Sequence, residues 1–212
     1  MKTTDSITCL FLDLGGVLLT NGWDHLVRRR AARQFKLNWS EMEEQHRLNF
    51  ELLEQDKLTL ADYLDRVVFY QKRPFTPAAF RNFMFAQSQA LPGMLALIRD
   101  LKLAYDLKIV VVSNESRELN AHRIRQFLLD EFVDIFISSS FVRLRKPDAD
   151  IFRLALDLAQ TPAQNILYLE DTPLFVKIAA GQGIRGLLHK DYPATRRQLA
   201  ALGLSLEKRI PS

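Results

Sequence analysis

Short apolar runs alternate with longer amphipathic segments along this sequence, and that alternation restricts the folds open to it. The first run, residues 7–13, ends in Asp-Leu-Gly-Gly, and the second, residues 107–113, is rich in β-branched residues. Short runs bounded by turn residues are typical of buried strands. Three more follow, at residues 133–138, 166–171 and 184–189. The pattern predicts five buried strands.

Helical patterns separate the later strands, at residues 93–105, 116–129, 148–160 and 172–182. Pro147 and Pro173 suit the first turn of a helix, Thr172 suits a cap, and Gly183 suits a helix end. Strands that alternate with helices of this length form a parallel sheet with right-handed crossovers. We therefore predict an α/β fold whose core is a doubly wound, Rossmann-like parallel sheet.

Residues 20–90 break this alternation. They contain no convincing strand but four amphipathic segments, at residues 24–36, 40–55, 59–71 and 77–90. About 70 helical residues are too many for a simple crossover. We predict that residues 20–90 are an inserted small α-helical cap domain, resting on a core built from residues 1–19 and 91–212.

The composition is that of a globular protein, with 48% hydrophobic and 25% charged residues. No apolar run approaches the roughly 18–20 residues of a membrane-spanning helix, and the first residues lack the basic start and long apolar stretch of a signal peptide. The single cysteine, Cys9, has no internal disulfide partner and lies in an apolar run, so we interpret it as a small buried residue. We expect a cytoplasmic protein with no membrane partner.

The net charge of +4 raises the question of a polyanionic partner. The charges are mixed, however: residues 20–90 hold 11 basic and 9 acidic side chains. The basic run at residues 28–30 lies on a predicted helix, where adjacent side chains point in different directions. We therefore expect no nucleic-acid partner.

Polar side chains follow several predicted strands at the point where each strand ends. In an open α/β sheet, ligands bind outside the carboxyl ends of the strands. Each residue alone has an ordinary explanation as a turn or cap residue, but together they predict a site. The residues are Asp13, Ser113, Asn114, Lys146, Glu170 and Asp171.

Four segments contain these residues in order. The first is Phe-Leu-Asp-Leu-Gly-Gly-Val-Leu at 11–18, and the second is Val-Val-Ser-Asn at 111–114. The third is Lys-Pro-Asp-Ala-Asp-Ile-Phe at 146–152, and the fourth is Tyr-Leu-Glu-Asp at 168–171, with Gly-Ile at 183–184. Together they resemble the four motifs of the haloacid dehalogenase-like hydrolases. The helical segment lies where one branch of this family carries its cap. The Asp-Leu-Gly start looks closest to bacterial sugar-phosphate phosphatases and to epoxide hydrolase N-terminal domains.

The resemblance implies a phosphatase that acts on a small phosphorylated metabolite, such as a sugar phosphate. Asp13 would attack phosphorus and form an aspartyl-phosphate, which divides hydrolysis into two easier steps. A Mg²⁺ ion would screen the repulsion between this carboxylate and the phosphate, held by Asp13, Asp171 and the backbone carbonyl of Gly15. Glu170 would support this metal site from behind.

The phosphate itself would meet three further groups. The resemblance implies that Lys146 neutralises charge on the nucleophile and on the phosphate. Ser113 and the Asn114 amide would hold phosphate oxygens.

The chain departs from the family pattern at two positions. Gly15 stands where most of these phosphatases carry a second Asp, which protonates the leaving group and later activates water; such help is typically worth ~10²–10⁴-fold in rate. The substrate could instead have a better leaving group, the reaction could need no proton, or Asp24, His25 or Glu51 could supply one. At the second position, Phe175 replaces an acid or Asn that supports the metal site, and Glu170 compensates in part.

Two other functions stay open. In a carbon–halogen hydrolase the halide leaves unprotonated, so Gly15 is no handicap, although such a metal-free enzyme has little use for the two acids at residues 170–171. A degenerate family member could instead bind a ligand without turnover. Specificity would come from the insert, with four candidates: Trp23, Phe50, Glu51 and Phe69. We expect a monomer or a homodimer.

Overall fold

The structure, a computed structural model that describes residues 6–206, is built on a parallel sheet of five strands. Their spatial order is β3-β2-β1-β4-β5, and every neighbouring pair is parallel. The strands are β1 (Cys9–Leu12), β2 (Lys108–Ser113), β3 (Ile135–Ser138), β4 (Ile166–Glu170) and β5 (Arg185–Leu188). The α/β prediction is therefore confirmed.

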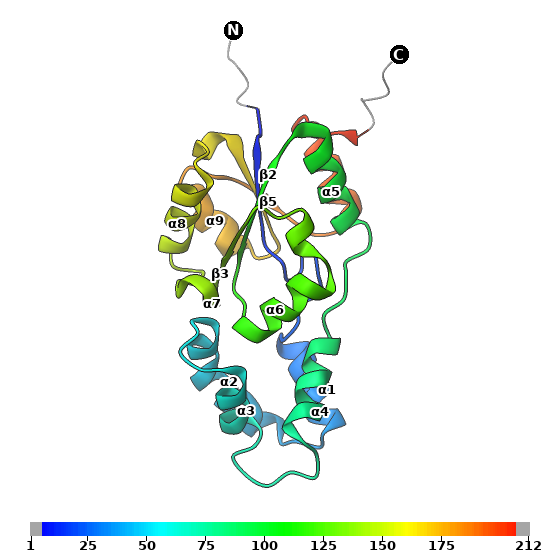
Figure 1. The fold of residues 1–212 in the computed structure, drawn as a ribbon, viewed down its shortest axis with the longest axis vertical. Helices are drawn as coiled ribbons and strands as arrows, with labels where there is room; N and C mark the ends of the chain where they lie inside the picture. The colour runs from blue at the N-terminus through cyan, green and yellow to red at the C-terminus, as the bar shows by residue number, and fades with distance from the viewer. Residues whose placement is uncertain (1–5, 207–212) are drawn as a thin grey trace.

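Helices cover both faces of the sheet (Figure 1). One face packs against α5 (Met94–Tyr105), α6 (Arg117–Gln126) and α10 (Tyr192–Ala201), and the other against α8 (Asp150–Ala159) and α9 (Pro173–Gly181). Alternate residues of β1 serve the two faces: Leu10 lies in one apolar cluster and Cys9 in the other. Short helices complete the connections, namely α7 (Ser139–Val142) and the 3₁₀ turns η1 (Leu129–Glu131) and η2 (Ala163–Asn165).

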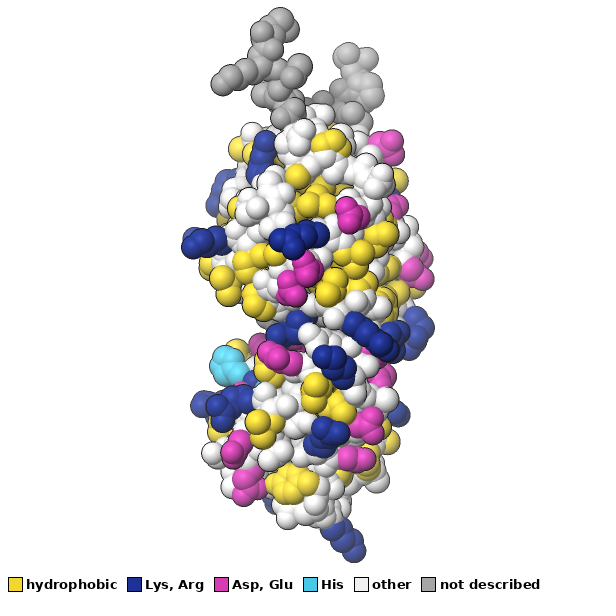
Figure 2. Space-filling view, turned by 90° about the vertical axis from the view of Figure 1, so that its left-hand side faces the viewer, with side chains coloured by type: hydrophobic (Ala, Val, Ile, Leu, Met, Phe, Trp, Pro, Cys, Tyr) yellow, Lys and Arg dark blue, Asp and Glu magenta, His cyan; other side chains and the backbone are white. Residues whose placement is uncertain are grey.

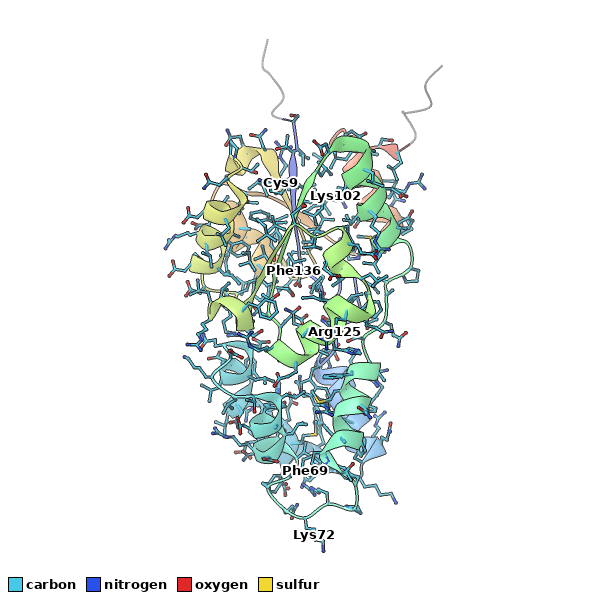
Figure 3. The ribbon with its side chains drawn as sticks, in the orientation of Figure 1. Cys9, Phe69, Lys72, Lys102, Arg125 and Phe136 are labelled. Atoms are coloured by element: carbon cyan, nitrogen blue, oxygen red, sulfur yellow. The ribbon has the colours of Figure 1, made fainter. Side chains whose placement is uncertain are left out.

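Cys9 is fully buried, as expected of a small apolar residue. Burial raises the pKa of its thiol to about 12, so the neutral form persists at physiological pH. Figure 3 shows Cys9 within the sheet, far from the helical insert.

The helical insert, residues 20–90, contains α1 (His25–Gln34), α2 (Trp39–Glu54), α3 (Leu60–Val67) and α4 (Pro77–Ala86). It packs around aromatic rings of its own, with Phe80 fully buried and in ring contact with Phe35 and Phe75. Capping side chains begin all four helices by accepting backbone N–H groups, since Asp24, Asn38, Thr59 and Thr76 are the N-caps. Figure 1 shows the insert at one end of the molecule, opposite the end where the described part of the chain begins and ends.

Several boundaries differ from the sequence prediction. Pro147 does not open a helix: its peptide bond with Lys146 is cis, and α8 begins three residues later. Thr172 is the N-cap of α9, but its side chain makes no capping hydrogen bond. Gly183 has φ of +81° just beyond α9, as a helix end requires. The helices α7 and α10 were not predicted, and the termini of the predicted core, residues 1–5 and 207–212, lie outside the described residues.

Among the described residues, no helix has both the length and the apolar character needed to cross a membrane. On the face drawn in Figure 2, Lys and Arg side chains are interspersed with Asp and Glu, and several basic groups gather at the level where the insert meets the core.

Candidate active site

The polar residues predicted from the sequence meet at the switch point of the sheet. After β1 the chain builds β2 and β3 on one side, and β4 and β5 then extend the other side. Leu12 is paired with Leu169, so Asp13 and Glu170 leave neighbouring strands at the same level. The backbone N–H of Asp13 donates to the carbonyl of Leu169 over 3.0 Å. This is where ligands bind in open α/β sheets.

Lys146 reaches this edge from the loop between α7 and α8. Its Nζ lies 3.2 Å from Oδ1 of Asp13, 2.7 Å from Oε2 of Glu170 and 3.1 Å from the hydroxyl of Tyr168, and the residue is only 1% exposed. Burial alone would lower the pKa of Lys146, but the carboxylates of Asp13 and Glu170 raise it above its usual value. The ammonium is therefore charged at physiological pH.

Asn114 fixes the position of this lysine. Its side-chain Nδ2 donates to the carbonyl of Lys146 over 2.8 Å, and its Oδ1 accepts the N–H of Lys146 over 2.9 Å. Both polar atoms of the side chain are thus engaged with the loop. A phosphate contact from Asn114 would have to come from its backbone N–H.

Asp13 is 8% exposed at the floor of a cavity. Burial raises the pKa of its carboxyl group, while the charge of Lys146 and the hydroxyl of Ser113 oppose that shift. Ser113 is 1% exposed and lines the same cavity. The structure therefore brings the predicted nucleophile, lysine and serine together.

Three carboxylates could hold a cation here, because oxygens of Asp13, Glu170 and Asp171 lie within 4.8 Å of one another. Glu170 is already engaged: Oε2 accepts from Lys146 and from the Tyr168 hydroxyl, and Oε1 accepts from the Thr172 N–H over 2.9 Å. That leaves Asp13 and Asp171 as the freer ligands, with Glu170 behind them. An all-oxygen donor set fits Mg²⁺.

Gly16 allows Asp171 to approach β1 closely. A Cβ atom on Gly16 would lie 1.9 Å from Oδ2 of Asp171, and φ at this glycine is +74°. Any side chain at this position would displace the carboxylate.

Phe175, which departs from the family pattern, packs against the lysine. The Nζ of Lys146 lies 4.8 Å from the centre of the Phe175 ring, within range of a cation–π contact. The residue therefore covers the ammonium group with an apolar face and offers no oxygen to a cation.

A cavity of about 420 Å³ extends from this cluster to the insert. Asp24, Trp23 and Phe50 line it, as do Gly15 and Asn114, whereas His25, Glu51 and Phe69 are not among the lining residues. Of the proton donors suggested by the sequence, only Asp24 therefore faces the cavity. Glu51 is mostly exposed and pairs with Arg145 over 3.0 Å, and Figure 3 shows Phe69 at the far end of the insert, away from the core.

Several cavity residues escaped the sequence prediction because they belong to no motif. They are Arg28, His46, Glu54, Glu115, Arg123 and Arg145. The signal available was a polar or charged residue on the apolar face of a predicted helix, as at His46 and Arg28, both at least nine-tenths buried. Such positions require partners.

His46 belongs to a hydrogen-bond chain inside the insert. The Trp23 Nε1–H donates to the Tyr63 oxygen over 2.8 Å, and the Tyr63 hydroxyl in turn lies 2.8 Å from Nδ1 of His46. Burial, with the nearby Arg28 charge, lowers the pKa of His46 to about 4. His46 is therefore neutral at physiological pH, with Nδ1 accepting and its proton on Nε2.

The fold and the site together define a class of α/β proteins that place acidic groups and a buried lysine at the carboxyl edge of a parallel sheet, beneath a helical insert. A model of the family described as haloacid dehalogenase-like hydrolase matches residues 7–183. The chain belongs to this family of hydrolases.

Individual relatives are distant. A glyceraldehyde 3-phosphate phosphatase from Pyrococcus abyssi is 25% identical over 183 residues, which cover 78% of this chain and 73% of the relative. A putative pyrophosphatase, PpaX, from Caldanaerobacter subterraneus is 29% identical over 84 residues, 40% of this chain and only 38% of its own length.

Solved structures support the fold. The HAD family enzyme bt-2542 from Bacteroides thetaiotaomicron superposes with a TM-score of 0.75 at 20% identity, covering 88% of this chain and 95% of that one. The L-2-haloacid dehalogenase RSc1362 superposes with a TM-score of 0.64 at 18% identity, covering 88% and 90%.

Proposed function

We propose that this protein is a Mg²⁺-dependent phosphatase that hydrolyses a small phosphorylated metabolite through an aspartyl-phosphate at Asp13. One observation carries the proposal: Asp13 and Lys146 form a buried pair beside Asp171 at the floor of a cavity. One relative is named a glyceraldehyde 3-phosphate phosphatase and another a putative pyrophosphatase, and the Bacteroides enzyme has also been solved with magnesium and inorganic phosphate.

In the first step a carboxylate oxygen of Asp13 attacks phosphorus, and the bond from phosphorus to the leaving-group oxygen breaks. Lys146 holds the nucleophile by its fixed positive charge and offsets the charge of the arriving phosphate. In the second step water attacks the aspartyl-phosphate, releases inorganic phosphate and restores Asp13.

The carboxylates of Asp13 and Asp171, with the carbonyl of Gly15, would hold Mg²⁺, which when bound offsets the negative charge of the phosphate. The Ser113 hydroxyl and the backbone N–H of Asn114 would hold phosphate oxygens. Glu170 keeps Lys146 in place through its 2.7 Å contact.

The helical insert is proposed to act as the cap that closes the cavity and selects the substrate. Arg145 beside the site pairs with Glu54 of α2 over 2.9 Å, and Arg117 pairs with Asp56 over 2.7 Å, so the insert is tied to the core by charge. A cavity of about 420 Å³ suits a small metabolite. Its mixture of aromatic and hydrogen-bonding groups suits a sugar phosphate.

The experiment is a screen of phosphorylated metabolites, including anomeric sugar phosphates, with phosphate release as readout. Wild type should turn over at least one compound with Mg²⁺, lose the activity in EDTA and regain it with added Mg²⁺. Asp13→Asn should be inactive while it unfolds at a temperature close to wild type. Equal background rates in both proteins would indicate a binding protein, and halide release from haloacids in EDTA would indicate a dehalogenase.

A further inference from the structure

Glu115 is a buried acid beside the proposed reaction centre with no role in the mechanism above. It lies two residues beyond Ser113 at the end of β2, is 5% exposed and lines the cavity. Its backbone is fixed by Ser139, whose Oγ accepts the Glu115 N–H over 2.9 Å and donates to the Glu115 carbonyl over 3.3 Å. The residue is thus held firmly at the edge that carries Asp13.

Arg123 of α6 holds one oxygen of this carboxylate. Its Nη1 donates to Oε1 of Glu115, its Nε donates to the Ser88 hydroxyl over 3.0 Å, and its Nη2 donates to the Thr20 carbonyl over 2.9 Å. The guanidinium group is therefore held by three hydrogen bonds, and Arg123 is only 1% exposed. Within residues 6–206, Oε2 of Glu115 makes no hydrogen bond, which leaves this oxygen free for a ligand.

The space around Gly15 shows why an acid is needed from another element. A Cβ atom on Gly15 would lie 2.5 Å from Oδ1 of Asn21, so Asn21 occupies the volume that a side chain there would enter. A Cβ on the next residue of that segment, Gly22, would lie 2.2 Å from Nη2 of Arg123. Residues 21–22 thus connect Gly15 to the Arg123–Glu115 pair.

The environment of Glu115 suits proton exchange. Burial raises the pKa of its carboxyl group to about 7, and the charges of Asp13 and Glu54 add to the effect of burial while that of Arg123 opposes it. Both protonation states are therefore populated at neutral pH, which is the condition for efficient acid–base catalysis. A phosphate dianion bound beside Asp13 would favour the protonated form further.

We propose that Glu115 is the catalytic acid and base that replaces the carboxylate missing at Gly15. This assignment rests on the proposed phosphatase function. As Asp13 bonds to phosphorus, the proton on Oε2 of Glu115 passes to the departing oxygen, which leaves as a neutral alcohol. The Glu115 carboxylate then takes a proton from water as that water bonds to phosphorus and the bond to Asp13 breaks.

Two other cavity acids are worse placed. Asp24 begins α1, and its Oδ1 accepts the Val27 N–H over 2.8 Å. Glu54 belongs to the insert, and Oε2 of its carboxylate is bound by Arg145. Glu115 instead follows β2, two residues beyond Ser113, on the sheet edge where Asp13 follows the neighbouring strand β1.

The test uses two substrates of nearly equal size, phenyl phosphate and p-nitrophenyl phosphate, with Mg²⁺ present. p-Nitrophenolate leaves readily without a proton, whereas phenolate does so poorly. Glu115→Gln keeps an oxygen for Arg123 but has no acidic proton. Its kcat/KM, which reports the step that phosphorylates Asp13, should fall by ~10²-fold or more with phenyl phosphate and only a few-fold with p-nitrophenyl phosphate.

The matched control is Glu118→Gln on α6, which changes the acid that accepts the Leu60 N–H and does not line the cavity. It should retain the wild-type rate with both substrates. Equal losses in Glu115→Gln with both substrates would reduce Glu115 to a structural role and overturn the assignment. The assignment would also be overturned if Glu115→Gln lost no activity with either substrate. The same holds if the selective loss of activity with phenyl phosphate occurred in Glu54→Gln instead.

Wild type supplies a second measurement that does not depend on a variant folding. Its kcat/KM should differ little between the two substrates. When the departing oxygen is protonated as it leaves, the rate depends only weakly on the acidity of the phenol that is released. A steep preference of wild type for p-nitrophenyl phosphate, with Asp13→Asn inactive, would refute the role of Glu115 and leave the phosphatase proposal standing. No Mg²⁺-dependent turnover of either substrate would overturn both.

Discussion

Replacing Lys146 by Met removes the charge on which the arrangement at the switch point depends. The ammonium group is 1% exposed and touches Asp13 at 3.2 Å and Glu170 at 2.7 Å, while Glu170 itself is fully buried. Met has a similar length and fills the space against Phe175. The substitution thus leaves two buried carboxylates without a cation, and little else changes.

Breaking a buried ion pair by removing one partner typically costs about 3–5 kcal/mol. For a chain of this size each kcal/mol shifts the melting temperature by about 2–4 °C, so we expect Lys146→Met to melt roughly 6–20 °C below wild type at pH 8. The comparison should be made in EDTA, because a bound cation would replace part of the lost charge.

The difference in melting temperature between Lys146→Met and wild type should depend on pH in a direction that the charges determine. Without the lysine to oppose the effect of burial, the folded-state pKa of Asp13 lies further above its unfolded value of about 4. The contribution of such a carboxyl group to the stability of the fold is fully present below its pKa in the unfolded chain. That contribution is lost as pH rises through its pKa in the folded protein. In wild type the raised pKa of Lys146 keeps its contribution present throughout this range and up to about pH 10. The gap between the two proteins should therefore be smaller at pH 5 than at pH 8.

Thermal unfolding followed by circular dichroism at both pH values measures this gap. Lys102→Met is the control: Lys102 pairs with Asp134 across a partly exposed contact, so its loss should cost about 0–1 kcal/mol with little pH dependence. If Lys146→Met and Lys102→Met melt alike, or if the gap for Lys146→Met widens at pH 5, the electrostatic description of the site is wrong.

The remaining predictions concern the metal site and the insert. Gly16→Ala and Gly203→Ala both place a side chain at positive φ, which should cost each protein about 1–2 kcal/mol of stability. Gly16→Ala should lose more than this, because only its side chain also clashes with Asp171. Mg²⁺ at 100 times its Kd should stabilise wild type and Gly203→Ala by about 2.7 kcal/mol and so raise their melting temperatures. The melting temperature of Gly16→Ala should not rise. Equal shifts in all three proteins would contradict the metal site. Arg145→Met should loosen the insert and speed proteolysis within residues 20–90, since it leaves the partly buried Glu54 without its ion-pair partner; an unchanged cleavage rate would show that these ion pairs do not hold the insert.

The sheet and the placement of its polar residues could be predicted from the sequence because both follow local rules. Apolar runs of strand length gave five strands, and all five lie in the sheet. Parallel strands end at one edge, so residues that follow β1 and β4 must be neighbours wherever those strands pair. Asp13 and Asp171, which are 158 positions apart, could be placed together on that reasoning alone.

The contacts around Glu115 could not be predicted in the same way. Arg123 reaches Thr20 and Ser88, 103 and 35 positions away, and nothing in the helical period of α6 distinguishes a buried arginine from an exposed one. The predicted helix start at Pro147 is likewise a loop in the structure, because the side chain of Asn114, 32 positions away, binds the backbone of Lys146 there. Such features depend on long-range packing, which periodicity does not report.

Location of the phosphoryl group on the chain tests the central claim most directly. Wild type should be mixed with Mg²⁺ and acetyl phosphate, quenched in acid within milliseconds, digested and examined by tandem mass spectrometry. A phosphoryl group on Asp13, absent from Asp13→Asn, is the result expected. A phosphoryl group on another residue, or an unmodified Asp13 while phosphate is being released, would contradict it.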